Sequence, residues 1–294
     1  MRRSLPSSGL LSIGVPAAFV VLWATGFVSA RLVAPYVEPM TFLVWRFGTT
    51  TAILLAFVLA VGAPWPKRAR DWGDAVVAGL LLQGVYLGCV FWAIAHGIPA
   101  GVAALIAAAQ PLLTALLAGT LLGERVSPLR WGGIATGFLG VGLVLWPKLG
   151  GPEAYPGPAL AASIGALLAM TAGTIWQKRT GAAIDLRMAA LIHFGASFLL
   201  VLGLACAFET GRIEFTPAFW VGYVWSVLGN SIGAVGLLLF MISRGAVVGV
   251  TSVLFLVPPI ALLMSNALFG DTMGPVQIAG MAVAVLGVAL AARP

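Results

Sequence analysis

The stretch GERVSPLRWGG, residues 123–133, returns 147 positions later as GDTMGPVQIAG, residues 270–280. At this offset the aligned pairs include Glu124 with Asp271, Pro128 with Pro275, Gly133 with Gly280, and Gly140 with Gly287. Outside the stretch, the same offset places RFG at 46–48 on HFG at 193–195, and Gln83 on Asn230. An ordered series of matches at one offset indicates an internal duplication. The sequence therefore predicts two copies of one structural unit.

The composition indicates that these copies lie in a lipid bilayer. The chain has 294 residues, of which 61% are hydrophobic and 9% are charged, with a mean hydropathy of +1.05. Soluble domains carry roughly 25% charged residues, and a helix that crosses a bilayer needs about 20 mostly apolar residues. Ten segments are long enough, at about 10–32, 40–62, 73–95, 98–121, 129–147, 158–177, 188–208, 217–241, 246–268 and 275–292. The sequence predicts an all-α membrane protein with ten transmembrane helices.

The duplication divides these helices into two five-helix units, residues 10–147 and 158–293. The linker between the units, residues 148–157, lies in a stretch rich in glycine and proline, as is typical of a boundary. Because five is an odd number, the second copy must enter the membrane upside down. The predicted fold is therefore two inverted five-helix repeats. Many secondary transporters are built in this way and bind substrate near the midplane, where the two halves meet.

Basic residues are concentrated on one side of the predicted helices. The formal net charge is +7; with a cytoplasmic N-terminus, most of the Lys and Arg residues fall in inner loops, and Lys148 and Arg212 fall outside. This bias places both termini in the cytoplasm and the linker in the periplasm. No basic patch is interleaved with aromatic residues, so the expected partners are the lipid bilayer and a small-molecule substrate, not nucleic acid. The first apolar segment is long enough to span and is interpreted as helix one, not as a cleaved signal peptide.

Several of these features together resemble a known family. The features are the duplication, the dipeptides QP at 110–111 and PP at 258–259, and the pattern GE…P…GG…G…G that follows the first dipeptide and recurs as GD…P…AG…G…G after the second. They resemble the drug/metabolite transporter superfamily in its EamA-type ten-helix branch. The likeness covers both halves, from residue 10 to about residue 293. Within that branch the overall pattern is most similar to the YddG amino-acid exporters, which are bacterial inner-membrane proteins. The resemblance implies a transporter whose substrate site lies at the interface between the repeats.

Polar and aromatic side chains at mid-membrane depth are candidates for binding the substrate. An amide in hydrocarbon without partners costs several kcal/mol, so it should point inward. An aromatic ring in a cavity can stack on an apolar substrate and attract an ammonium group. The candidate substrate-binding residues are Trp23, Gln83, Tyr86, Gln110, Trp176 and Asn230. The alternative interpretation is that the amides only hold helices together and that the tryptophans pack against lipid.

Two spans carry proline near mid-membrane, where a proline inside a helix costs about 3 kcal/mol or more. The candidate hinge residues are Pro111, Pro258 and Pro259, together with Gly101 and Gly249. The carbonyls freed four residues before each proline would be those of Ala107, Leu254 and Phe255. Freed backbone groups at that depth are tolerated where protein or a water-filled cavity satisfies them. The alternative is a packing kink, because proline is common in membrane helices.

Arg46 and His193 are the chargeable residues that lie well inside predicted spans, at equivalent places in the two copies. An arginine at that depth costs about 2.5 kcal/mol or more and needs a partner, for which Glu38 is the nearest acid in the sequence. We interpret the intramembrane charge at Arg46 and His193 either as part of a structural ion pair or as a gate. All nine carboxylates fall in loops or at span ends, so no acid is placed at the midplane to bind a coupled proton or a sodium ion.

No HExxH, GxSxG or P-loop pattern occurs, and Cys89 and Cys206 lie singly inside spans, so no catalytic residue, metal site or cofactor is expected. We predict a secondary transporter that exports amino acids, especially bulky apolar or aromatic ones, across the bacterial inner membrane by alternating access. The chain is expected to function as a monomer. The main alternative is a multidrug or other small-metabolite permease. A non-transporting receptor would leave the inverted repeat without a purpose, and an intramembrane enzyme would lack a catalytic motif.

Overall fold

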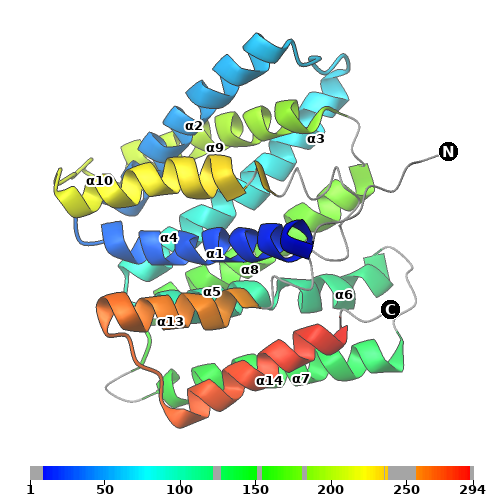
Figure 1. Ribbon diagram of the computed structural model, residues 1–294, viewed down its shortest axis with the longest axis vertical. Coiled ribbons are helices and arrows are strands. Elements are labelled where there is room, and N and C mark those ends of the chain that lie inside the picture. The colour runs from blue at the N-terminus through cyan, green and yellow to red at the C-terminus, as the bar shows by residue number, and fades with distance from the viewer. Residues whose placement is uncertain are drawn as a thin grey trace.

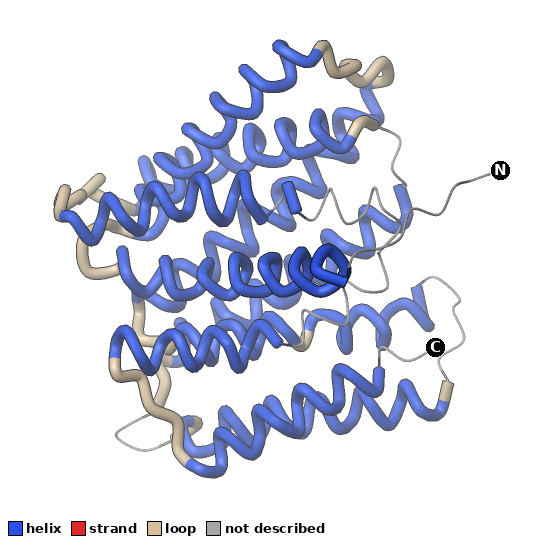
Figure 2. Tube along the Cα trace, viewed as in Figure 1, coloured by secondary structure: helices blue, strands red, loops and turns tan. Residues whose placement is uncertain are grey.

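The structure is a computed structural model that describes residues 9–121, 127–150, 154–180, 184–234, 236–237 and 256–291. In these residues the chain is helical apart from its connections, and a single isolated bridge pairs Val37 with Ile213. The helices lie side by side across the view of Figure 1, and the connections that the structure describes in full are short loops (Figure 2). The first described turn of α1 and the last of α14 lie at the same side of the bundle.

The described helices account for parts of all ten predicted spans. They are α1 (Gly9–Val33), α2 (Pro39–Val61), α3 (Ala69–Gly79), the π-helix η1 (Leu80–Val85), α4 (Tyr86–Ala95), α5 (Ala100–Ala108), α6 (Gln110–Leu121), α7 (Pro128–Leu145), the short 3₁₀ turn η2 (Trp146–Lys148), α8 (Gly157–Thr180), α9 (Leu186–Phe208), α10 (Pro217–Val224), the π-helix η3 (Trp225–Ala234), α13 (Val257–Phe269) and α14 (Pro275–Ala291). The third span is α3, η1 and α4 in series, and the fourth is α5 and α6. Within the described residues, 7 helical segments are long and apolar enough to cross a membrane, and α13 and α14 are shorter apolar helices.

Large apolar side chains cover the outside of the bundle. Leu139, Leu199 and Leu263 have 62%, 67% and 69% of their surface exposed. Exposed apolar side chains on this scale are unfavourable in water but suit a bilayer, in which the lipid tails are as apolar as leucine. This surface agrees with the predicted class, a multi-span helical membrane protein.

Local sequence signals set several helix ends. Ser127 and Thr216 each accept a hydrogen bond from the backbone N–H three residues later, and Pro128 and Pro217 follow them at the first helical position. A hydroxyl cap and a proline at that position both suit the start of a helix, where the backbone N–H groups have no partner within the helix. Helix α2 ends at Gly62, which adopts a positive φ of 62°.

Helices α7 and α14, the last of each repeat, pack with their backbones almost in contact (Figure 1). A Cβ atom added to Gly140 would lie 2.6 Å from the carbonyl oxygen of Gly280, and one added to Gly287 would lie 2.8 Å from that of Gly133. Gly133 and Gly280 are equivalent positions of the repeats, as are Gly140 and Gly287, so each contact recurs with the helices exchanged. Because Gly133 near the start of α7 faces Gly287 near the end of α14, equivalent helices run antiparallel. This is the inverted arrangement that the sequence predicts.

The same relation holds for α2 and α9. A Cβ atom on Gly48 would meet the ring of Phe198 at 3.1 Å, and one on Gly195 would meet the methyl group of Thr51 at 3.6 Å. Gly48 and Gly195 are repeat equivalents, and so are Thr51 and Phe198. Helix α4 of the first repeat packs on α8 of the second. The equivalent contact, with the repeats exchanged, is that of α10 and η3 of the second repeat with α1 of the first. The two halves therefore interlock about an approximate twofold axis.

Two π-helical segments interrupt the third and eighth spans at equivalent depths. Segment η1 covers residues 80–85 and η3 covers residues 225–234, and Gln83 and Asn230 lie inside them. The buried Ser197 of α9 donates its hydroxyl proton to the carbonyl of Gly79, just before η1, at 3.0 Å. Wide turns of this kind are rare and often occur at functional sites. The sequence analysis did not predict them.

One end of the bundle is fastened by contacts between repeats. We call it the outer end, after the side on which the predicted topology places it; it carries the loops 34–38, 96–99, 209–216 and 270–274. Glu209 accepts hydrogen bonds from the backbone N–H groups of Met40 and Thr41 at 2.8 and 2.6 Å, and so caps α2 from the other repeat. Arg31 forms an ion pair with Asp271 at 3.9 Å, which links α1 to the loop between α13 and α14.

Candidate functional site

A buried arginine lies at the centre of the candidate site. Arg46 is on the third turn of α2, about 10 Å from the helix start, and only 4% of its surface is exposed. Its Nε donates a hydrogen bond to the hydroxyl of Ser231 in η3 at 3.0 Å, and its guanidinium carbon lies 5.8 Å from the ring centroid of Phe91 on α4. The Nη1 atom is buried and has no hydrogen-bond partner.

Asn230 adjoins Ser231 and joins η3 to α1. Its Nδ2 donates to the carbonyl of Leu22 at 2.7 Å and to the hydroxyl of Thr25 at 3.3 Å, while its Oδ1 is buried without a partner. Gly26 makes room for this amide, because a Cβ atom there would lie 3.2 Å from Nδ2. Part of the amide therefore fastens two helices, and its acceptor oxygen stays unused.

Two further side chains complete the group. Tyr86, the first residue of α4 after η1, is buried and lies close enough to Arg46 to interact with it electrostatically. Thr50, one helical turn after Arg46, is fully buried, and its hydroxyl has no partner. We call Arg46, Thr50, Tyr86, Asn230 and Ser231 the polar cluster. It lies where α1, α2, α4 and η3 pack together.

The sequence singled out Arg46, Tyr86 and Asn230 separately; in the structure Arg46 interacts with Tyr86, and Asn230 is the chain neighbour of Ser231, to which Arg46 is hydrogen-bonded. Sequence reasoning missed Thr50, Ser231 and Phe91. Ser231 could have been found from the repeat, because it replaces Gly84 at the equivalent position and so adds a hydroxyl where the first copy has none.

The expected pairing of Arg46 with Glu38 is wrong. The Glu38 carboxylate accepts hydrogen bonds from the backbone N–H groups of Thr210 and Arg212 at 3.0 and 2.8 Å, in the loop of the other repeat. Glu38 lies just before α2 at the outer end, whereas Arg46 lies two turns deeper and faces η3. Slight burial tends to raise the pKa of Glu38, but these hydrogen bonds outweigh it and lower that pKa below its usual value.

Gln110 and Trp176 lie in other contacts. Gln110 donates from Nε2 to the hydroxyls of Thr114 at 2.9 Å and Thr174 at 3.1 Å, and so fastens α6 to α8. Trp176 donates from its indole nitrogen to the carbonyl of Asp74 at 3.2 Å, near the start of α3. Since the third span is helical from there to Tyr86, this tryptophan lies about 18 Å along the helix from Tyr86. In this conformation both side chains tie helices together.

The remaining candidates have fewer specific contacts. Trp23 is half-buried and packs on Phe19 with ring centroids 5.5 Å apart. Gln83 is half-buried in η1, and its side chain makes no hydrogen bond within the described residues. His193 lies where α9 crosses the end of α3, and a Cβ atom on Gly79 would lie 3.0 Å from its carbonyl oxygen.

The candidate hinge prolines lie in the first turns of the described helices α6 and α13. The fourth span breaks at Ala109, whose N–H bonds the carbonyl of Ile106 at 3.1 Å, and Pro111 is the second residue of α6. Pro258 and Pro259 lie in the first turn of α13. A proline in a first turn loses no helical hydrogen bond, so the cost expected for a helix interior does not apply.

The other hinge candidates divide between the described and undescribed parts. Gly101 is a close-packing position, because a Cβ atom there would lie 3.1 Å from the Cα atom of Leu262 on α13. Gly249, Leu254 and Phe255 lie outside the described residues.

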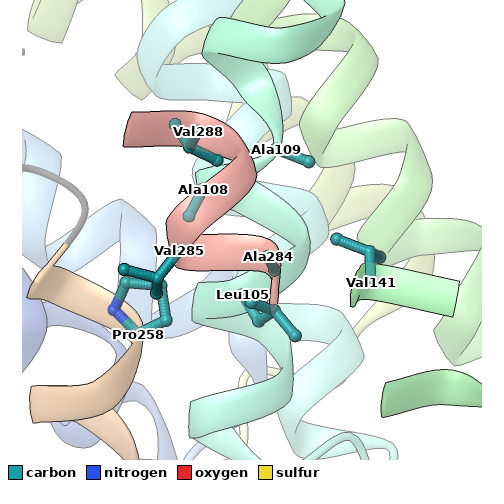
Figure 3. A pocket seen from close by; sticks show the side chains of 8 residues that line it. All are labelled: Leu105, Ala108, Ala109, Val141, Pro258, Ala284, Val285 and Val288. Atoms are coloured by element: carbon teal, nitrogen blue, oxygen red, sulfur yellow. The ribbon is translucent and has the colours of Figure 1, made fainter. Parts of the chain in front are cut away.

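A small apolar cavity lies beside the break in the fourth span (Figure 3). Its lining residues are Leu105, Ala108, Ala109, Val141, Pro258, Ala284, Val285 and Val288. Its volume is about 10 Å³, which is room for about one water molecule. It is therefore a packing gap between α5, α7, α13 and α14, and it is too small for an organic solute.

No cluster of possible metal ligands occurs among the described residues, and Cys89 and Cys206 are free thiols. Cys206 is exposed on the surface of α9.

Comparison with known proteins agrees with this architecture. The model of the EamA-like transporter family matches the chain twice, at residues 10–146 and 157–293. The uncharacterized inner membrane transporter YedA of Escherichia coli is 27% identical over 98% of this chain and 91% of its own. The uncharacterized transporter YvbV of Bacillus subtilis is 27% identical over 93% and 89%. A protein of Streptantibioticus cattleyicolor named "probable terminal-alkyne amino-acid exporter" is 26% identical over 93% and 91%.

A solved crystal structure of another protein shares the fold, with a TM-score of 0.65, 21% identity and coverage of 96% of both chains. Fold and relatives together define an inverted-repeat transporter of the membrane. The chain belongs to the EamA-like transporter family. These relatives do not single out the YddG exporters, so that narrower resemblance stays a prediction.

Proposed function

We propose that this protein is a secondary transporter that exports amino acids, especially bulky apolar or aromatic ones, and related small metabolites across the bacterial inner membrane. The observation that carries the proposal is the polar cluster, which holds unpaired donors and acceptors in the interior of an inverted-repeat fold. A relative named as an amino-acid exporter and another named as an inner membrane transporter support it.

The unpaired groups of the polar cluster destabilise the ligand-free protein. A buried polar atom without a partner costs about 1–3 kcal/mol, and the cluster contains three such atoms, Arg46 Nη1, Thr50 Oγ1 and Asn230 Oδ1. They come from two spans, the second and the eighth. A small solute with polar groups at one end and an apolar side chain at the other would satisfy these atoms and place its side chain beside Tyr86 and Phe91.

Transport by alternating access requires the outer end to open. The contacts that must separate are the capping of α2 by Glu209, the bonds of Glu38 to the opposite loop, and the ion pair between Arg31 and Asp271. Residues 10–147 and 158–293 would move as the two units, joined by a periplasmic linker at 148–157. The break at Ala109 is the bending point that the described part of the fourth span offers.

The expected partners are one small-molecule substrate and the bilayer, with the chain acting as a monomer and no nucleic acid involved. The chief alternative is a multidrug or other small-metabolite permease, which the same architecture would allow. Non-transporting receptors and intramembrane enzymes remain distant alternatives, and a flux assay separates them from a transporter.

The test is counterflow of labelled amino acids in liposomes that contain the purified protein. We expect uptake of leucine or phenylalanine into liposomes preloaded with the same amino acid, with weaker uptake of alanine, and none in protein-free liposomes. Tyr86→Ala should reduce the flux of aromatic substrates more than that of alanine, because it removes a ring beside the cluster. Flux of drugs without flux of amino acids would favour the permease, and absence of flux for every solute would contradict transport.

A further inference from the structure

We propose that Arg46 binds the carboxylate of the transported solute, so that the polar cluster selects organic acids and zwitterions over cations. The proposal rests on the proposed function, since it assigns a substrate class to the same site. It begins from the chemistry of the arginine, which the family match leaves unexplained.

The charge of Arg46 has no anionic partner in the described chain. The ion pairs found there lie at helix ends and in loops, and they are Arg31 with Asp271, Arg70 with Asp74, Arg187 with Asp185, and Arg212 with Glu214. Arg46 instead has one hydrogen bond, to a neutral serine. Buried charges in proteins are normally paired. A ligand would therefore supply the anion that the described residues lack.

The available donors of Arg46 have the geometry that a carboxylate needs. Ser231 binds Nε at 3.0 Å and so fixes the plane of the guanidinium group. The terminal Nη1 is buried with an unused N–H group. An arginine with a free terminal edge can donate two parallel hydrogen bonds to the two oxygens of a carboxylate.

Comparison of the repeats argues against a purely structural role. The equivalent crossing, of α9 with α3 and η1, places His193 of α9 against Gly79, and Ser197 and Leu200 against Gly84. That crossing packs without an arginine and with no hydroxyl at position 84. The fold therefore does not require an arginine and a serine at such a crossing, and the hydrogen bond between Arg46 of the first repeat and Ser231 of the second has no counterpart at the equivalent crossing.

The neighbours of Arg46 match the rest of an amino acid. The unpaired Oδ1 of Asn230 is an acceptor suited to an ammonium group. The Phe91 ring centroid lies 5.8 Å from the guanidinium carbon and Tyr86 interacts with the same group, and both rings suit an apolar side chain. A cationic drug without a carboxylate would place its charge beside an unpaired guanidinium, which is repulsive.

The test compares ligands that differ only at the carboxylate. The probes are L-phenylalanine, its amide L-phenylalaninamide, and phenethylamine, each used to compete with labelled phenylalanine in counterflow. We expect the wild-type protein to require roughly 10- to 100-fold more amide than acid for half-maximal competition, because a hydrogen bond to a charged group is lost. Arg46→Gln should bring this ratio close to one, and Arg46→Lys should leave an intermediate value.

The matched control is Arg212→Gln, which removes one positive charge from an exposed loop. This variant should keep the wild-type ratio. Heat unfolding of the purified proteins in detergent is a second measurement. Phenylalanine, but not the amide, should raise the melting temperature of the wild-type protein and not that of Arg46→Gln. Without ligand, Arg46→Gln should melt at the same or a higher temperature, since it removes a buried unpaired charge.

Each outcome distinguishes the two proposals. Equal competition by acid and amide in the wild-type protein would overturn the role of Arg46 while leaving transport intact, and this comparison needs no variant that must fold. If Arg46→Gln melts at a lower temperature than the wild-type protein without ligand, and keeps the wild-type ratio of amide to acid needed for half-maximal competition, Arg46 has a structural role. Stabilisation by phenylalanine without flux would keep the binding site and contradict transport. The absence of both stabilisation by phenylalanine and amino-acid flux would overturn both proposals.

Discussion

The contact between α7 and α14 makes a sharp prediction about single methyl groups. A Cβ atom on Gly140 would lie 2.6 Å from the Cα atom of Ala284 and still closer to its backbone nitrogen, whereas ordinary contacts begin at 3.4 Å, so the helices must separate by at least about 0.8 Å. A radial gap of 0.5 to 1 Å forfeits about a quarter to a half of the dispersion energy of each contact. Gly140→Ala should therefore lower the free energy of unfolding by about 1–3 kcal/mol, which is typical of overpacking.

Gly142 on the same helix is the matched control. A Cβ atom there would meet nothing within 4 Å, so Gly142→Ala should be neutral or stabilising by about 0.5–1 kcal/mol through the lower backbone entropy of the unfolded chain. Both variants are compared by heat unfolding in the same detergent. Gly287→Ala should behave like Gly140→Ala, and the double variant should cost less than the sum because one separation of the helices relieves both clashes. Equal stability of Gly140→Ala and Gly142→Ala would refute the close crossing.

Three further predictions test other parts of the structure. Hydrogen bonds from Arg187 lower the pKa of Asp185 to about 2, against a weaker opposing effect of burial, whereas the carboxyl in an unfolded chain has a pKa of 3.8. The ionised Asp185 therefore stabilises the protein above pH 4. The difference in melting temperature between wild type and Asp185→Asn should shrink as pH falls toward 2. Pro111→Ala should change the free energy of unfolding by less than about 1 kcal/mol, because Pro111 lies in a first turn, and a loss or gain near 3 kcal/mol would show that it acts inside a continuous helix. Single cysteines placed at residues 67–70 and at 150–154 should react with impermeant reagents from opposite sides of the membrane, and labelling from one side alone would contradict the predicted topology.

The spans and their inverted arrangement could be predicted from the sequence because the bilayer imposes them. A membrane-crossing helix needs a fixed apolar length, and the first, second and seventh spans agree with α1, α2 and α9 to within about two residues. The inversion follows from the duplication and from an odd number of spans per copy. Neither step depends on which way a side chain points.

The site could be predicted only in part, because the direction of a side chain is poorly encoded in a helix that is apolar on every face. Depth alone selected Asn230 and Tyr86, which lie in the polar cluster, and equally selected Gln110 and Trp176, which tie other helices together. Nearness in sequence suggested Glu38 for Arg46, but the helix carries the two side chains to different depths. The π-helical segments have no distinctive residues in an otherwise continuous apolar run, so no pattern indicated them.

The backbone of the two repeats is close to symmetric, but their polar contacts are not, and this difference has consequences for a transporter. Identical inverted repeats would give outward-open and inward-open states of equal free energy. Here Glu209 caps α2 at the outer end, while its repeat equivalent at the opposite end of the bundle, Gly62, has no side chain. Asp185, the repeat equivalent of Glu38, binds Arg187 of its own helix. Each unmatched contact adds to the free-energy difference between the two states, and a ligand can offset that difference only by binding one state more tightly. The contacts at the outer end therefore favour the state in which that end is closed.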